Sequence, residues 1–303
     1  MRKFQMTIMT LLAIVVSLLV YVGSTEEEGQ VLGEKIESGA VEVTFLDIGQ
    51  GDATFIEFSD GQQMLIDCSE DARVIEALGR VMEFYDKSID YLVVTHPDSD
   101  HYGGCIDVMK RFDVGHIIYT GFQKDTDIHH TFLTTVEEEV SLGAEYTQLD
   151  AEGIWKIASS SVHFLYPDHD VVSDAVVPGF TKIDSNDTSI VMKITHGSKD
   201  MLLMGDASED LESYLMSTYS DQLDAGVLKV GHHGSGSSSH EEFLDFVSPN
   251  IAAISAGRNN QYGHPSLRVL KRLERVGAKV LRTDKIGDIL IEMNTNDIYV
   301  QEN

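Results

Sequence analysis

The sequence predicts an α/β protein that folds as an αββα sandwich over residues 41–303, and three observations lead to this expectation. Short β-rich runs alternate with amphipathic helical runs along almost the whole chain. Each half of the chain begins with a meander of strands and continues with alternating strands and helices. Of the 303 residues, 42% are hydrophobic, which is enough for a large core. Two facing sheets covered by helices accommodate this order of elements.

The first half of the domain is expected to begin with three strands joined by glycine-containing turns, at 41–48, 53–58 and 63–68. A helix over 71–86 is predicted because several apolar residues fall on one helical face: Val74, Ile75, Leu78, Val81, Met82 and Tyr85. The other elements expected in this half are strands at 91–95 and 114–119 and helices near 103–112 and 131–142.

The second half repeats the pattern of the first. Its expected strands are 161–166, 188–195, 200–206, 227–230, 251–255 and 278–282. Its expected helices are 208–218 and the segments near 240–247 and 266–276. A hairpin formed by 286–293 and 297–300 closes the domain.

The first 24 residues are typical of an export segment. Arg2 and Lys3 precede an apolar run at 6–22 that is interrupted only by hydroxyl residues. Both a cleaved signal peptide and an uncleaved membrane anchor fit this pattern, and a buried core helix fits it less well. Either form of export places the domain outside the cytoplasm, secreted or anchored to the outer face of the cytoplasmic membrane. Residues 25–40 are polar and acidic and predict a linker.

Composition restricts the class of partner. Lys and Arg number 22 against 50 Asp and Glu, which gives a formal net charge of −28. A general nucleic-acid-binding face needs a basic patch, so this charge argues against one. Two cysteines, Cys68 and Cys105, are too few for a disulfide framework, and the sequence leaves open whether they are bridged or are two small buried residues.

A concentration of metal-ligand side chains follows the apolar strand at 91–95. His96, Asp98, Asp100 and His101 lie within six residues. Pro97 favours an extended backbone before it, so His96 and Asp98 point the same way and can hold one ion. Asp100 and His101 lie at the turn into a helix and would face a second ion. Imidazole and carboxylate together suit Zn, Mn or Fe. The alternative is a polar loop in which Asp98 or Asp100 caps a helix.

Two later strands also end in potential ligands. Asp206 closes the predicted strand 200–206, and its two oxygens could bridge both ions. The alternative for Asp206 is an N-cap for the helix at 208–218. His232 and His233 follow the predicted strand 227–230, and one of them could complete the second metal site.

These motifs resemble the metallo-β-lactamase superfamily, and most closely the hydrolase domain of the ComEC/Rec2 competence proteins. The matching pieces occur in family order over about residues 41–293, and they are 45–53 (FLDIGQGDA), 65–67 (LID), 95–104 (THPDSDHYGG), 186–190 (NDTSI), 203–206 (LMGD), 228–235 (LKVGHHGS) and 262–265 (YGHP). The resemblance implies an αββα sandwich of the metallo-β-lactamase type and a site for two divalent ions, Zn or Mn.

The resemblance also implies roles for single residues. His96 and Asp98 would hold the first ion, Asp100 and His101 the second, and Asp206 would bridge them. His232 would complete the second site, with His233 as the other candidate. The residues expected around the metals, in the substrate loop or behind the ligands, are Asp47, Gln50, Asp52, Asp67 and Asn186. Asp100 and His264 are the expected catalytic residues, with His264 placed over the substrate as a phosphate contact or general acid.

One departure from the family pattern concerns a separate ligand histidine. Many members of the superfamily have one between the first motif and the bridging Asp. His116, His163 and His169 fall in that part of the chain, but their strand and loop positions favour structural roles. The first ion is therefore expected to have few protein ligands.

The predicted function is that of an extracytoplasmic dinuclear metal-dependent hydrolase acting on phosphodiesters, with DNA as the ComEC-like substrate. A phosphorylcholine-esterase-like hydrolase of a cell-wall phosphoester is the alternative enzyme. The alternative that is not an enzyme is a non-catalytic DNA-uptake accessory protein. The membrane is a further expected partner if the N-terminal segment is uncleaved. A DNA substrate would need a local cationic rim, for which the candidates are Lys229, Arg258, Arg268, Arg282 and Lys285; scattered solubilising charge is the other explanation for these residues.

Overall fold

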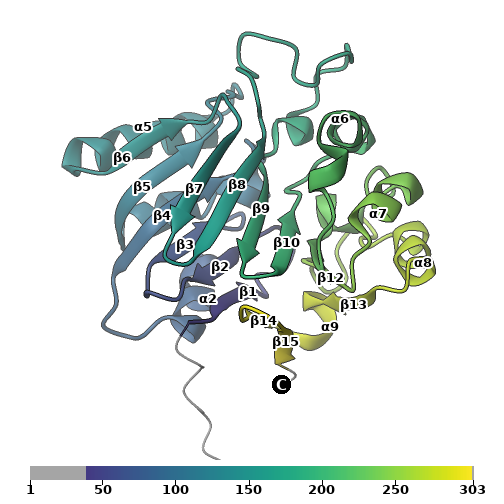
Figure 1. The fold of residues 1–303 in the computed structure, drawn as a ribbon. Coiled ribbons are helices and arrows are strands. Elements are labelled where there is room, and N and C mark those ends of the chain that lie inside the picture. The colour runs from purple at the N-terminus through teal and green to yellow at the C-terminus, as the bar shows by residue number, and fades with distance from the viewer. Residues whose placement is uncertain (1–38, 302–303) are drawn as a thin grey trace, which may run out of the picture. The chain divides into compact units, whose positions relative to one another are not determined.

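The computed structural model describes residues 39–301, which form two mixed sheets that face each other (Figure 1). The predicted export segment and all but the last two residues of the predicted linker lie outside the described residues. Within the described part of the chain, no helix is long and apolar enough to cross a membrane.

The first sheet has eight strands in the order β15-β14-β1-β2-β3-β4-β5-β6. Its central meander is antiparallel, and β3 to β6 run parallel to one another. The strands are β1 (Val41–Phe45), β2 (Thr54–Glu57), β3 (Gln63–Ile66), β4 (Ser88–Val94), β5 (Asp113–Tyr119), β6 (Glu145–Gln148), β14 (Ile289–Met293) and β15 (Ile298–Gln301).

The second sheet has seven strands in the order β13-β12-β11-β10-β9-β8-β7. Strands β7 to β10 form an antiparallel meander, and β10 to β13 run parallel. They are β7 (Gly153–Ile157), β8 (Ser160–Tyr166), β9 (Val191–His196), β10 (Lys199–Leu203), β11 (Val227–Lys229), β12 (Ile251–Ile254) and β13 (Lys279–Arg282). Each sheet therefore combines a meander with parallel strands, as the sequence predicts.

Helices cover the outer face of each sheet. The first sheet is covered by α2 (Arg73–Val81), α4 (Cys105–Met109) and α5 (Asp127–Leu142), and the second by α6 (Glu209–Tyr219), α7 (Glu241–Val247) and α8 (Leu267–Arg275). The short helices are α3 (Ser99–Tyr102) and α9 (Thr283–Ile286), with 3-10 turns η1 (Ser185–Thr188), η2 (Ser220–Gln222) and η3 (Gly231–Gly234). In Figure 1, α6, α7 and α8 stand together on one side and α5 lies on the other.

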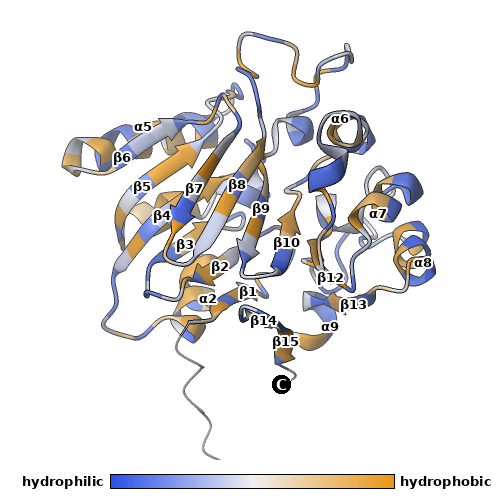
Figure 2. Ribbon diagram, viewed as in Figure 1, coloured by the Kyte–Doolittle hydropathy of each residue, from blue (hydrophilic) through white to orange (hydrophobic). Residues whose placement is uncertain are grey.

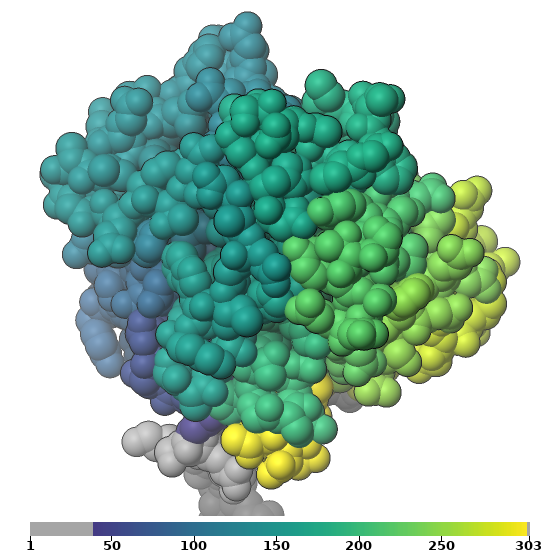
Figure 3. Space-filling view, turned by 45° about the horizontal axis from the view of Figure 1, so that its top comes forward, coloured from purple at the N-terminus to yellow at the C-terminus, as the bar shows by residue number. Residues whose placement is uncertain are grey.

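Three hydrophobic layers hold these elements together. The central layer lies between the sheets and joins residues such as Phe45 and Ile56 to Met192 and Val227. The two outer layers pack the helices onto the sheets. Hydrophobic positions run along the strands, while the helices α6 to α8 turn hydrophilic residues outward (Figure 2). The space-filling view shows the first half of the chain on one side and the second half on the other (Figure 3). The αββα sandwich is confirmed.

The structure departs from the predicted elements in a few places. Strands β6 and β7 were not predicted. Helix α2 ends at Val81, so Tyr85 is 81% exposed instead of lying on a buried helical face. The predicted helix near 103–112 is shorter than expected, because α4 spans only Cys105–Met109; the separate short helix α3 precedes it. The closing hairpin joins the first sheet because β14 pairs with β1 from the opposite end of the domain (Figure 1).

Candidate metal centre

The predicted ligands meet where strands of the two sheets end. His96 to His101 follow β4 of the first sheet, Asp206 follows β10 and His233 follows β11 of the second. Among residues 39–301, one group of His, Cys, Asp and Glu has the spacing of a metal site: Asp52, His101, Asp206 and His233. One ligand atom of each lies within 4.8 Å of the others, and all four residues are buried.

His96 is oriented by a chain of hydrogen bonds from Asp67. Both oxygens of Asp67 are used, since Oδ1 accepts from the Thr95 amide at 2.8 Å and Oδ2 accepts from the Thr95 hydroxyl at 2.7 Å. Because the hydroxyl gives its proton to Asp67, it accepts at 3.0 Å from Nδ1 of His96. The proton of the neutral ring is therefore on Nδ1, and Nε2 carries a free lone pair, as metal ligation requires.

His101 and His233 are oriented in the same way. Nδ1 of His101 donates to Asp67 at 2.7 Å, and Nδ1 of His233 donates to the carbonyl of Ser255 at 3.2 Å. The Nε2 atoms of His96, His101 and His233 are all buried without a hydrogen-bond partner, as are Oδ1 of Asp206 and Oδ1 of Asp52. Buried polar atoms without partners are rare in folded proteins.

The other oxygen of Asp206, Oδ2, faces the three histidines. Oδ2 of Asp206 lies 3.3 Å from Nε2 of His101, 3.5 Å from Nε2 of His233 and 4.0 Å from Nε2 of His96. Lone pairs on nitrogen and oxygen repel at such distances unless a positive charge lies between them. This set of donor atoms fits divalent metal ions.

The electrostatics of the site favour positive charge. Burial lowers the pKa of His101, but Asp206 and Asp67 outweigh it and raise the pKa well above its ordinary value. Burial raises the pKa of Asp206, but His233 and His101 outweigh it and hold the pKa well below its ordinary value. For His96, burial dominates and lowers the pKa to about 4, which keeps this ring neutral and able to act as a ligand.

Asp52 lies deeper than the sequence predicts for a loop at the mouth of the site. Gly51 brings it there, because Gly51 has φ +116° and a Cβ at this position would lie 2.4 Å from the carbonyl oxygen of Asp100. Oδ2 of Asp52 accepts a hydrogen bond from Lys229 at 2.8 Å. Lys229 is 3% exposed, so it was wrongly predicted as part of an exposed rim; both faces of β11 are covered.

Asp98 and Asp100 lie at the edge of the cluster. Oδ1 of Asp98 is 4.0 Å from Nε2 of His96 and also contacts Lys124 and the hydroxyl of Ser185. Oδ2 of Asp100 is 3.4 Å from Nε2 of His233. Asp98 occupies the N-cap position of α3 but makes no side-chain capping hydrogen bond, so the alternative of a capping loop is not supported.

The alternative role of Asp206 as a helix cap is excluded. Helix α6 is capped by Ser208, whose side chain accepts from the amide of Asp210. Asp187 in turn accepts hydrogen bonds from the amide and hydroxyl of Ser208 at 2.9 Å. The carboxylate of Asp206 is thus left to face the histidines.

His232, which the sequence analysis preferred as a ligand, has a different environment from His233. Its Nε2 lies 3.9 Å from Asp206, its side chain is 25% exposed, and its Nδ1 lies 3.4 Å from the side-chain nitrogen Nδ2 of Asn186. His264 lies beside it, with ring centroids 5.7 Å apart. His264 and Asn186 therefore lie at the open side of the site, next to His232.

The other predicted residues fall into two groups. Asp47 and Gln50 line a cavity beside the metal cluster. The three histidines for which structural roles were predicted bond elsewhere: His116 to Thr147, His163 to Glu152 and His169 to Asp168.

Unusual backbone conformations gather around the cluster. Asp67, Ser69, His232 and His233 all have positive φ, between 47° and 66°. Non-glycine residues rarely adopt this region, and such strain concentrates at functional sites. These four residues are consistent with a functional role for the cluster, although Ala158, Ser239, Ser248 and Asn259 have positive φ elsewhere in the described residues.

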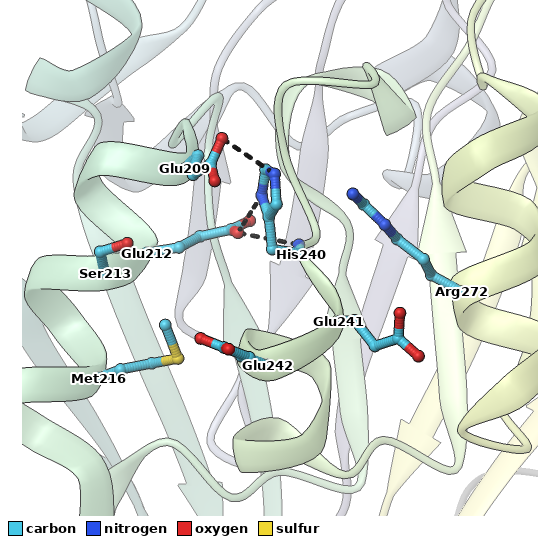
Figure 4. A pocket seen from close by; sticks show the side chains of 8 residues that line it. All are labelled: Glu209, Glu212, Ser213, Met216, His240, Glu241, Glu242 and Arg272. Atoms are coloured by element: carbon cyan, nitrogen blue, oxygen red, sulfur yellow. Dashed lines mark hydrogen bonds and ion pairs between the residues drawn. The ribbon is translucent and has the colours of Figure 1, made fainter.

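Glu212 of α6 holds the loop that follows His232 and His233 by hydrogen bonds (Figure 4). Its buried carboxylate accepts hydrogen bonds from the amides of Ser239 and His240, and from Nδ1 of His240 at 3.3 Å. The same side chains border a cavity of about 260 Å³. Burial raises the pKa of Glu212, although His240 opposes this.

Replacing Glu212 with alanine is expected to lower the free energy of unfolding by about 2 kcal/mol, because two backbone amides lose their acceptor. The melting temperature should fall by roughly 4–8 °C in a thermal unfolding experiment. Glu242→Ala is the matched control, since this exposed glutamate lines the same cavity. Equal melting temperatures for the two variants would contradict this role of Glu212.

Sequence reasoning missed two contributions to the site. Thr95 is the hydrogen-bond link between Asp67 and His96, and Lys229 is the partner of Asp52. Thr95 directly precedes His96, and Lys229 lies three residues before His232, so both fall inside the motifs that resemble the family. A polar residue at the end of an otherwise apolar strand was the available signal.

The comparisons with known proteins agree with this geometry. The sequence pattern of the metallo-beta-lactamase superfamily matches residues 46–258. ComE operon protein 3 of Bacillus subtilis (strain 168) is 33% identical over 204 residues, which is 67% of this chain and 24% of that protein. Competence protein ComA of Neisseria gonorrhoeae is 32% identical over 215 residues, 71% of this chain and 27% of that protein. The chain spans about a quarter of the length of these relatives.

A similar solved structure supports the fold. The metallo-beta-lactamase fold protein YhfI from Bacillus subtilis aligns with a TM-score of 0.51 over 87% of this chain and 100% of that chain. The sequence identity is 12%, so this likeness concerns the fold alone.

Proposed function

Since the chain belongs to the metallo-beta-lactamase superfamily, we propose that it is a dinuclear metal-dependent phosphodiesterase that acts outside the cytoplasm. One observation carries the proposal. The Nε2 atoms of His96, His101 and His233 and one oxygen each of Asp52 and Asp206 are buried without hydrogen-bond partners, and the other oxygen of Asp206 lies within 4.0 Å of all three nitrogens. A buried cluster of imidazoles and carboxylates of this kind is suited to cations.

The distances suggest how the ligands would be shared between two ions. His96 and Asp98 would hold one ion, and His101, His233 and Asp100 the other, with Asp206 between them. Zn and Mn are the proposed metals because both accept imidazole and carboxylate. When bound, such ions activate water for attack and stabilise the negative charge that develops on the reacting group.

The protein itself orients the ligands. Asp67 fixes the rings of His96, through Thr95, and of His101 directly. Lys229 holds one oxygen of Asp52 and leaves the other facing the cluster. Oriented ligands of this kind typically raise metal affinity 10–100-fold. Four aspartates at the cluster, Asp52, Asp98, Asp100 and Asp206, make a harder ligand set than a histidine-rich one, and this favours phosphodiesters over β-lactams as substrates.

DNA is the substrate that we favour among phosphodiesters. One relative is named competence protein ComA, and the sequence motifs resemble the ComEC/Rec2 hydrolase domain. The net charge of −28 opposes long polyanions, so a DNA substrate requires local positive charge at the site.

Location outside the cytoplasm is supported by a disulfide. Cys68 and Cys105 are bridged, with Cα atoms 5.1 Å apart, and such bonds persist in oxidising compartments. The bridge joins the residue after Asp67 to the start of α4, and the amide of Cys68 donates to the carbonyl of His101. It therefore fastens the orienting carboxylate to the ligand segment.

The Cys68→Ser/Cys105→Ser variant is expected to lose about 3 kcal/mol of stability, because the bridge closes a loop of 37 residues. Reductant should lower the melting temperature of the parent protein and leave that of the variant unchanged. Protein isolated from cells under thiol-blocking conditions should carry the bridge. Two freely labelled thiols in that protein would contradict the proposed location.

The proposed activity is tested with bis(p-nitrophenyl) phosphate. Protein stripped with chelator should be inactive, and addition of Zn or Mn should restore p-nitrophenolate release. The chromogenic β-lactam nitrocefin should not be turned over at a comparable rate. Efficient hydrolysis of nitrocefin without hydrolysis of any phosphodiester would overturn the proposed substrate class.

His264 is proposed to protonate the leaving group, because it lies beside His232 at the open side of the site. His264→Ala should lower kcat about 100-fold for thymidylyl-thymidine, whose leaving alkoxide needs a proton. For thymidine p-nitrophenyl phosphate the loss should stay small, since p-nitrophenolate departs without protonation. Equal losses on both substrates would leave His264 as a binding residue only.

A further inference from the structure

A cavity of about 480 Å³ lies between two loops that also carry Asp52 and His264 of the candidate site. One wall is the loop after β1, with Asp47, Gly49 and Gln50, together with Arg73 from the start of α2. The other wall is the loop after β12, with Gly257, Arg258 and Asn260. None of the predicted metal ligands lines this cavity.

The cavity borders the metal centre on two flanks. Gln50 is two residues before Asp52, and the amide of Asp52 donates to the carbonyl of Asp100 at 3.1 Å. On the other flank, the side chain of Asn260 accepts from the amide of His264 at 3.0 Å and donates to its carbonyl at 2.6 Å. The cavity walls are therefore fastened to the segments that carry Asp100 and His264.

The two walls are fixed relative to each other. The amide of Gly257 donates to Oε1 of Gln50 at 3.2 Å. A Cβ at Gly257 would lie 2.7 Å from the backbone nitrogen of Gln50, so only glycine permits this close approach. The cavity is thus formed before a ligand arrives, which lowers the entropy loss of binding.

Hydrogen-bond donors without partners line the cavity. Arg258 is exposed and makes no hydrogen bond or ion pair with any described residue. Gln50 uses its Oε1 as an acceptor, which leaves its Nε2 amide as a donor. Arg73 also lines the cavity, but its guanidinium pairs with both oxygens of Asp71 and donates to the carbonyl of Ile48, so Arg258 is the lining arginine without a partner among the described residues. The lining side chains include two arginines and one carboxylate, Asp47, in a protein of net charge −28.

We propose that this cavity is a subsite for a second phosphate of the substrate, the one next to the phosphodiester at the metal centre. Arg258 supplies the principal contact, because a free guanidinium binds phosphate oxygens bidentately. The proposal rests on the proposed phosphodiesterase function and makes it more specific. It favours oligonucleotides over diesters that contain a single phosphate.

The test compares Arg258→Gln with Arg111→Gln, a control that removes the same charge. Arg111 is an exposed arginine before the amino end of β5, whereas the metal ligands follow the carboxyl ends of strands. Binding of a fluorescent phosphorothioate hexathymidylate, which resists cleavage, is measured by anisotropy with the metal-loaded full chain. Hydrolysis of bis(p-nitrophenyl) phosphate is measured in parallel.

Arg258→Gln should weaken hexathymidylate binding about tenfold and reduce the slope of log Kd against log salt by about 0.7, the value for one lost phosphate contact on a single strand. Arg258→Lys should restore part of the affinity, and Arg111→Gln should bind like the parent. Hydrolysis of the single-phosphate substrate should stay within twofold for all variants.

Unchanged binding in Arg258→Gln, no binding by the parent protein, or equal losses in the two glutamine variants would each overturn the subsite. The binding measurement decides this even if no phosphodiester is hydrolysed, an outcome that would overturn the proposed function separately. A loss of bis(p-nitrophenyl) phosphate hydrolysis equal to the loss of binding would place Arg258 at the metal centre and also overturn the subsite.

Discussion

Asp206→Ala is expected to remove both metal ions and to lower kcat by about 1,000-fold, equivalent to roughly 4 kcal/mol of activation free energy. The reason is the position of this one carboxylate, whose Oδ2 lies within 4.0 Å of the Nε2 atoms of His96, His101 and His233. Elemental analysis of the purified variant and its rate on bis(p-nitrophenyl) phosphate measure both effects.

Asp221→Ala is the control for the loss of a negative charge, since Asp221 is exposed and lies outside the site. This control should keep its metal and its activity. Full metal occupancy in Asp206→Ala would contradict the bridging position of this carboxylate.

The two adjacent histidines are expected to behave differently when each is replaced. His233→Ala should weaken binding of the second zinc ion by at least about 100-fold, because Nε2 of His233 is buried, lacks a partner and lies within 3.5 Å of two aspartates. His232→Ala should weaken it far less, since His232 is partly exposed and its Nε2 lies 3.9 Å from Asp206.

Competition with a chromophoric chelator measures both zinc affinities, and thermal unfolding checks that each variant is folded. Each variant is the control for the other, because both remove one histidine from adjacent positions of the same loop. A large loss in His232→Ala with retention in His233→Ala would support the ligand that the sequence analysis preferred.

Much of the fold could be predicted because local patterns determine it. The alternation of apolar strands and amphipathic helices agrees with the observed elements, and each half has its meander and its parallel strands. Strand β6 was not predicted because its four residues, EYTQ, are polar and mostly exposed, and pairing with β5 makes them a strand. The place of the closing hairpin beside β1 depends on a contact between the ends of the domain, which local patterns do not encode.

Part of the site could be predicted because several potential metal ligands directly follow apolar strands. The predicted ligands at the ends of β4, β10 and β11 do lie close together, because both sheets present the ends of these strands to the same place. The choice between His232 and His233 could not be made from strand periodicity, since both residues lie in η3 with positive φ, where side chains no longer alternate. The depth of Asp52 depends on the positive φ of Gly51, which the sequence alone does not specify.

Lys229 shows a different limit of sequence reasoning. Lysine is usually exposed, and its place in a basic rim was the ordinary expectation. In the structure it is buried because an aspartate from the other sheet, Asp52, pairs with it. A long-range pair of this kind can be recognised only when the two sheets are seen together.

The number and position of the bound metal ions decide whether Asp206 joins a dinuclear centre. Anomalous diffraction from crystals of the zinc-loaded protein, recorded at the zinc absorption edge, reports both. We expect two peaks in contact with Asp206, one beside His96 and one beside His101 and His233. A single peak, two peaks away from Asp206, or no peak in protein that hydrolyses bis(p-nitrophenyl) phosphate would contradict this expectation.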